Sequence, residues 1–278
     1  MSDILTVVFR TFMSHTGLKT DLAADPPPPA ATTRSALVVG DHSVSRSVLL
    51  LAAVTAASHL GLRVMFFTRT QIQSLPASLQ KCVPSLSPES LKVQVTPLPN
   101  CGTVEELLHQ IASLHESTNT SPTPPSLIIV DRLEGFLRGH SELHPGEQSC
   151  AAHLSALLCD TAAFLTQVLE KRPSSSGPCR VIASFRSQED AGQAGGEASA
   201  TDPVLDILDR YFQVRCTLDQ DRGYEAAAAG LQQVWNIYLS GRGIADASDT
   251  KDCEDRPAEA QEWQLLIYPD GLMEFKVV

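Results

Sequence analysis

The residues from Gly40 to Ser47 have the spacing of a phosphate-binding loop. Such a loop reads G-x-x-x-x-G-K-S/T between a buried strand and a helix. Its backbone N–H groups hold phosphate, and its last hydroxyl meets Mg²⁺. Gly40 and Ser47 match this pattern, whereas Ser45 stands at the second glycine and Arg46 at the lysine. The sequence therefore predicts a nucleotide-type site with two altered positions, and an ordinary strand–turn–helix is the alternative.

The two altered positions change the chemistry of this loop. A side chain at Ser45 obstructs the approach of the backbone to a phosphate. Arg46 keeps the positive charge of the lysine, but its guanidinium is bulkier and planar. His42, also in the loop, is interpreted as a solvated residue without a role of its own. ATP with Mg²⁺ is the cofactor that the pattern implies, and the two changes argue against its tight binding.

A second candidate residue, Asp131, follows the apolar run Leu127–Val130. In nucleotide hydrolases an acid at the end of such a strand holds Mg²⁺. Many buried strands end in Asp, so this motif alone is weak. Its place about 85 residues after Arg46, with strands and helices between them, supports both motifs together. We expect Gly40 and Asp131 to lie at the carboxyl ends of neighbouring parallel strands, where open α/β sheets bind ligands.

The elements that must position these residues alternate along the chain. Near-continuous apolar strands that alternate with helices are typical of a parallel sheet covered on both faces. The expected strands are 36–39, 63–68, 91–95, 127–130 and 180–185, and the expected helices are 45–60, 103–115 and 148–170. After residue 202 consecutive strands follow, at 211–218, 234–240 and 263–278, the last with a turn at 269–271. The predicted fold class is α/β, mainly parallel with an antiparallel C-terminal extension.

Composition sets the domain boundaries and excludes some functions. Four prolines at 26–29 predict that residues 1–34 are a flexible tail and linker before one domain at 35–278, with disordered insertions near 186–202 and 241–261. The seven cysteines show no CxxC pair, so we expect no bound metal beyond a nucleotide's Mg²⁺. We expect no membrane association, because no apolar run approaches about 20 residues. A net charge of −11 argues against an extended nucleic-acid-binding face.

Several short stretches, taken in order, carry a family resemblance. They are 65–69 with 72–76, 125–131 with 133–134, 157–164, 188–192 and 208–212. These stretches resemble the ATPases associated with SWIM-type zinc-finger proteins, which are divergent paralogues of the RecA-like recombinases in Shu-type complexes. The similarity covers roughly residues 36–218 and leaves out residues 1–33 and the acidic stretch near 241–261.

The resemblance implies a RecA-like P-loop fold, binding of single-stranded DNA and ATP hydrolysis that this DNA stimulates. It also implies a SWIM-type zinc-finger partner, recombinase paralogues as further partners, and support of recombinase filaments in homologous recombination in the nucleus. Of the family's site residues, only Gly40, Ser47 and Asp131 are present. The position of the catalytic glutamate falls near Thr70, and that of a polar sensor residue falls at Arg186.

Three functions are compatible with these features. The first is a repair adaptor that acts through partners and DNA, with weak or absent ATP hydrolysis. The second is an active ATPase, stimulated by single-stranded DNA, in which Arg46 substitutes for the lysine. The third is a metabolic P-loop kinase, which is disfavoured because no basic lid-like segment follows the core. We expect the first.

Any DNA binding should be modest and salt-dependent, because the average field of an acidic protein repels phosphate. The stretch from 186 to 201 contains one basic residue and three acids. Better candidates are Arg132 and Arg138, which flank the acid at the strand end, and Arg210 and Arg215 near the next strand. Ordinary surface salt bridges are the alternative for each of these four arginines.

Overall fold

The fold is built on one sheet of nine described strands. In this computed structural model, the described residues are 4–13, 34–69, 75–86, 95–99, 102–116, 124–138, 146–172, 177–187, 202–221, 223, 231–241 and 261–278. The strands are β1 (Ser35–Val39), β2 (Val64–Thr68), β3 (Val95–Pro99), β4 (Leu127–Val130), β5 (Arg180–Phe185), β6 (Val214–Asp221), β7 (Gln233–Ser240), β8 (Gln261–Ile267) and β9 (Met273–Val277). The helices are α1 (Ile4–Thr11), α2 (His42–Ser58), α3 (Ala77–Cys82), α5 (Val104–Glu116), α6 (Leu133–Leu137), α7 (Glu147–Glu170) and α8 (Pro203–Tyr211).

The order of the strands confirms the predicted fold class. It is β3-β2-β4-β5-β1-β6-β7-β8-β9, parallel from β3 to β6 and antiparallel from β6 to β9. The expected turn at 269–271 joins β8 to β9. Most of the two expected insertions, at 188–201 and 242–260, lies outside the described residues.

One expectation about the site was wrong. Gly40 and Asp131 follow β1 and β4 at the same edge of the sheet, but β5 lies between these two strands. The spatial order of parallel strands depends on how far each crossover reaches, which the sequence pattern does not show. The inserted strand places Ser184, near the carboxyl end of β5, between the two motifs.

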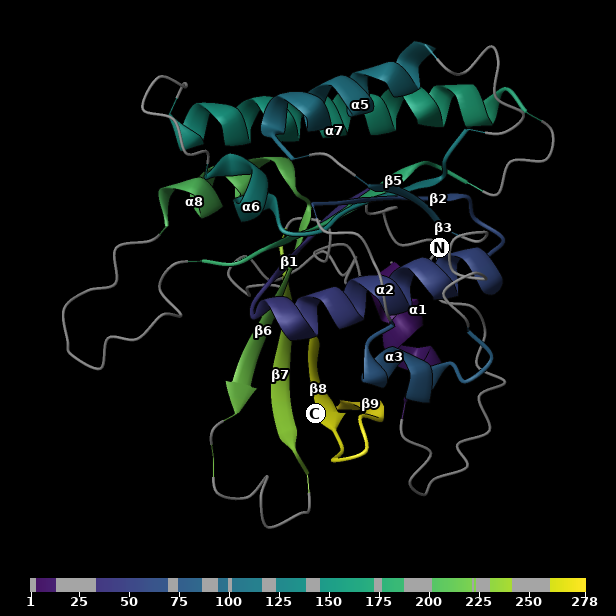
Figure 1. The fold of residues 1–278 in the computed structure, drawn as a ribbon, viewed down its shortest axis with the longest axis vertical. Helices are drawn as coiled ribbons and strands as arrows, with labels where there is room; N and C mark the ends of the chain where they lie inside the picture. Colours follow the sequence, from purple (N-terminus) through teal and green to yellow (C-terminus); the bar gives the residue numbers. More distant parts are fainter. Residues whose placement is uncertain are drawn as a thin grey trace, which may run out of the picture.

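Helices cover both faces of the sheet, as expected (Figure 1). Helices α1, α2 and α3 pack on one face, and α5, α6, α7 and α8 pack on the other. Along β1, Ala36 and Val38 belong to the first core, whereas Leu37 and Val39 belong to the second. This alternation explains why the central strands are apolar throughout: successive side chains enter opposite cores.

Helix α7 matches the long helix expected at 148–170. By length and composition alone it would suffice to cross a membrane. One face of it is nevertheless buried in the second core, through residues such as Leu154, Leu158 and Leu165. Helix α7 also packs against α5, α6, α8 and β5.

The expected N-terminal tail is in part a helix of the core. In α1, Ile4, Leu5, Val8 and Phe9 are buried. The ring of Phe9 stacks on that of Phe275 in β9, with centroids 4.7 Å apart. The prediction of a flexible tail was therefore wrong for residues 4–13, because a contact between the two ends of the chain leaves no local pattern. Residues 14–33, with the four prolines, lie outside the described residues.

Replacing Phe9 with alanine should lower the free energy of unfolding by about 3 kcal/mol, because a fully buried ring leaves a cavity. The measurement is urea denaturation of the full chain. Arg10→Ala, on the exposed side of the same helix, is the matched control and should change stability by about 0.5 kcal/mol or less. Equal effects of the two substitutions would show that α1 is not part of the core.

Candidate functional site

The loop that should cradle phosphate is the first turn of a helix. Helix α2 begins at His42, with Asp41 as its N-cap. The Asp41 carboxylate accepts the backbone N–H of Ser43 at 2.9 Å and its hydroxyl at 2.6 Å. The N–H of Ser45 donates to the carbonyl of Asp41 at 2.9 Å. Two of the donors that a phosphate would need are thus already bound within the helix.

The packing of β1 against β6 requires a glycine at position 40. A Cβ atom at this position would lie 2.8 Å from the Leu218 Cβ and 2.9 Å from the Leu218 carbonyl oxygen in β6. Both separations are too short for a side chain, so only glycine lets β1 and β6 approach here. The match of Gly40 to the loop pattern is therefore explained by the sheet alone.

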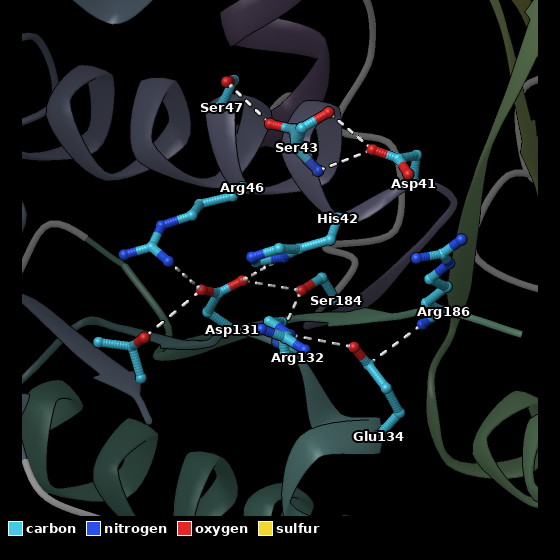
Figure 2. A network of polar contacts seen from close by, with 11 residues as sticks. Asp41, His42, Ser43, Arg46, Ser47, Asp131, Arg132, Glu134, Ser184 and Arg186 are labelled. Atoms are coloured by element: carbon cyan, nitrogen blue, oxygen red, sulfur yellow. Dashed lines mark hydrogen bonds and ion pairs between the residues drawn. The ribbon is translucent and has the colours of Figure 1, made fainter. Parts of the chain in front are cut away.

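Arg46 lies against Asp131 (Figure 2). Its Nη1 atom is 3.7 Å from Asp131 Oδ2, and the Asp131 side chain is completely buried. His42, one helical turn before Arg46 and on the same face of α2, places Nδ1 4.0 Å from Asp131 Oδ1. The hydroxyls of Ser184 and Thr68 also donate to this carboxylate, at 3.3 Å and 3.5 Å. His42 is thus half-buried and faces Asp131, which corrects its interpretation as a solvated loop residue.

The shifted pKa values of Asp131 and His42 indicate how this cluster is charged. Burial raises the pKa of Asp131 to about 6, against the opposing effects of Arg46 and the Ser184 hydroxyl. Burial, together with the nearby charges of Arg132 and Arg46, lowers the pKa of His42 to about 4. Near neutral pH, Asp131 is therefore ionised and paired with Arg46, and His42 is neutral.

The Ser47 side chain does not face Asp131. The Ser47 hydroxyl donates to the Ser43 carbonyl at 3.0 Å and lies 3.1 Å from the hydroxyl of Ser78 in α3, on the side of α2 away from Asp131 (Figure 2). Ser45 is buried, and its hydroxyl has no hydrogen-bond partner in the part of the chain that the structure describes. Mg²⁺ with a nucleotide does not fit this arrangement, because the N–H groups of Ser43 and Ser45 already have acceptors and Arg46 occupies the side of Asp131 that a metal ion would need.

Four arginines surround the short helix α6 at the same edge. Arg132, before the helix, has φ 64° and ψ 68°, and its N–H donates to the Ser184 hydroxyl at 2.9 Å. Arg138, after the helix, donates to the Arg186 carbonyl at 3.4 Å. Arg69 donates to the Gly135 carbonyl.

The buried Glu134 accepts the Arg186 N–H at 3.1 Å and lies 3.4 Å from the Arg132 Nε atom. Three of the expected positions, Arg132, Arg138 and Arg186, are thus brought together.

The other two arginines lie elsewhere. Arg215, the second residue of β6, pairs in register with Leu37 in the middle of β1. Its guanidinium contacts Asp209 Oδ2 at 3.0 Å. Arg210 is in the last turn of α8, just before β6. The structure therefore does not place Arg210 and Arg215 with the site residues, and Thr70 lies outside the described residues.

Sequence reasoning missed several residues of the site. Asp41 could have been found, because an aspartate directly before a helix is a common N-cap. Ser184, Glu134 and Arg69 reach the site only through the strand order and through α6, for which the chain has no clear signal.

The strand order, the helix after β1 and the acid at the end of β4 define a RecA-like α/β domain with an altered nucleotide site. The chain is 35% identical over 205 residues to the ATPase SWSAP1 of Mus musculus, a match that covers 73% of this chain and 65%, just under two thirds, of the mouse protein. It is 31% identical over 189 residues to the ATPase SWSAP1 of Homo sapiens, covering 66% of this chain and 71% of the human protein. The chain therefore belongs to the SWSAP1 family.

No protein-family model matches the chain. Among solved structures, a KaiC-like protein of Pyrococcus horikoshii OT3 is similar with a TM-score of 0.46 and 10% sequence identity, over 88% of this chain and 89% of that protein.

Proposed function

We propose that this protein is a RecA-like adaptor of homologous recombination in the nucleus that works without turning over ATP. It pairs with a SWIM-type zinc-finger protein, binds single-stranded DNA and, with recombinase paralogues, supports recombinase filaments. The observation that carries the proposal is the Arg46–Asp131 pair, which uses both charged positions of the nucleotide site for an internal contact. Membership of the SWSAP1 family supports the recombination setting.

The arginines around α6 support DNA binding at the carboxyl edge of the sheet. The side chains of Arg132 and Arg138 are 41% and 31% exposed, whereas those of their acidic neighbours Glu134 and Asp202 are each 8% exposed. The acids therefore lie below the surface. The Arg132 side chain is the more exposed of the two arginines, whereas the Arg138 guanidinium lies 5.9 Å from the centre of the Phe185 ring and donates to the Arg186 carbonyl. A local positive patch of this kind can attract phosphates although the protein as a whole is acidic.

Changing both Arg132 and Arg138 to alanine should weaken binding of single-stranded DNA by about tenfold and lower the salt slope by about 1.4, as expected for two lost phosphate contacts. The measurement is a fluorescence anisotropy titration at two salt concentrations. The charge-matched control is the double variant Arg210→Ala, Arg215→Ala, which should bind as the wild type does. Equal losses in both double variants would show that only net charge matters and would exclude a site at α6.

The C-terminal edge of the sheet supports a dedicated protein partner. Strand β9 is the outer strand of the described sheet. Phe12 and Met13 pair with it at Phe275, and Val277, beyond this contact, is 55% exposed. An edge strand with apolar side chains favours association unless it is covered. Gel filtration of the purified chain mixed with the SWIM-type protein should show one complex, and two separate peaks would contradict the pairing.

A further inference from the structure

Charges of the chain itself occupy both ends of the altered nucleotide site. At the N-terminus of α2, where a helix favours a bound anion, lies the carboxylate of Asp41. Burial raises the pKa of Asp41, but the hydroxyl and N–H of Ser43 outweigh it, so the net pKa lies below its usual value. Asp41 therefore supplies a carboxylate of the chain itself to the N–H and the hydroxyl of Ser43 at the N-terminus of α2.

The positive charge at the other end of the site also comes from a side chain of the protein, Arg46. The guanidinium of Arg46 lies 3.7 Å from the carboxylate that would hold a metal ion, and its side chain is only 19% exposed. Asp131 also receives hydrogen bonds from Thr68 in β2 and Ser184 in β5. One carboxylate thus connects α2, β2 and β5 to the end of β4.

These contacts tie together elements that a ligand would otherwise connect. A nucleotide with its metal ion stabilises one arrangement of such elements only when it is bound. Here α2 and the end of β4 are connected by the contact between Arg46 and Asp131, two residues that are always present. A helix joined to the sheet by the chain's own charges has no need of a ligand to hold its position.

We propose that Asp41 and Arg46 are an internal substitute for a metal-bound nucleotide: Asp41 caps the N-terminus of α2, and Arg46 holds α2 against the end of β4 in one arrangement at all times. This inference rests on the part of the proposed function that needs no ATP turnover, but not on the DNA or the partner. It predicts that Asp131 can bind another cation, such as Mg²⁺, once the Arg46 guanidinium has been removed.

The test is hydrogen exchange of the full chain in the first turn of α2, with and without millimolar MgCl₂. In the wild type this turn should be protected, and neither MgCl₂ nor ATP with MgCl₂ should change its exchange. In Arg46→Ala the same amides should exchange about tenfold faster, and MgCl₂ should restore most of the protection. In the double variant Arg46→Ala, Asp131→Asn, exchange should be fast and insensitive to MgCl₂.

Two controls keep the result interpretable. Arg138→Ala removes another arginine at the same edge, 3.9 Å from Asp202, and should leave exchange in α2 unchanged. The double variant removes both charges and should remain folded even if Arg46→Ala alone is unstable. The proposal would be overturned if protection of the wild type depended on ATP with MgCl₂. It would also be overturned if MgCl₂ had no effect on the exchange of Arg46→Ala. Neither result would bear on DNA binding or the partner, which are measured separately.

Discussion

Replacing Arg46 with methionine should lower the free energy of unfolding by about 2–3 kcal/mol near pH 8, because it leaves a buried, ionised Asp131 without its cation. The loss should nearly vanish near pH 5. The pKa of Asp131 in the folded protein is already raised to about 6, and it should rise further without Arg46. A carboxyl group with a raised folded pKa is most favourable when protonated, and it loses stability as the pH rises from its unfolded pKa to its folded pKa.

The measurement is urea denaturation of wild type and variant at each pH. Other groups near Asp131 also titrate or carry charge, namely His42 from α2 and Arg132 and Glu134 beside α6. Arg46 also lowers the pKa of His42, so the difference between wild type and Arg46→Met contains a contribution from His42, and comparison with the Asp131→Asn background isolates Asp131. Arg46→Met combined with Asp131→Asn should recover most of the loss at pH 8.

Arg138→Met is the matched control for an ion pair that is partly exposed and should cost about 1 kcal/mol or less at either pH. A loss that is the same at both pH values would mean that Arg46 matters only for packing.

Steady-state ATP hydrolysis should be at least about 100-fold slower than that of an intact RecA-like ATPase, with or without single-stranded DNA. Catalysis in these enzymes is largely positioning and charge stabilisation around the transferred phosphate. Here the N–H of Ser43 is held by Asp41, Arg46 lies on Asp131, and the Ser47 hydroxyl points to Ser43 and Ser78.

A phosphate-release assay with Mg²⁺ measures this turnover. Asp131→Asn is the control, because it removes the acid that would hold the metal ion. Wild type and Asp131→Asn should give the same background rate. A wild-type rate close to that of an intact ATPase, lost in Asp131→Asn, would show that Arg46 leaves Asp131 and works in place of the lysine.

The central sheet could be predicted from the sequence because its strands are buried on both faces. That burial makes segments such as Leu127–Val130 apolar throughout, and it separates them from helices with one apolar face. The antiparallel extension was equally clear, because after α8 the strands follow one another without helices. The carboxyl edge as the place of the site followed from the parallel strands alone.

The contacts within the site could not be predicted, for physical reasons that differ from residue to residue. The direction of the Arg46 side chain depends on whether a phosphate loop or a helical turn follows Gly40, and Asp41 decides this by capping α2. The hydrogen bonds from Ser184 to Asp131 depend on the insertion of β5 between β1 and β4. The docking of α1 depends on Phe275 near the other end of the chain.

The most direct test of a nucleotide-independent adaptor is to recover the tagged full chain from cells with its bound proteins and to measure the nucleotide that it carries. The expected result is a stoichiometric SWIM-type zinc-finger protein, no stoichiometric ATP or ADP, and the same yield of complex from the Asp131→Asn variant. A complex that contains one nucleotide per chain and is lost in Asp131→Asn would contradict the account, as would recovery of the chain without any SWIM-type protein.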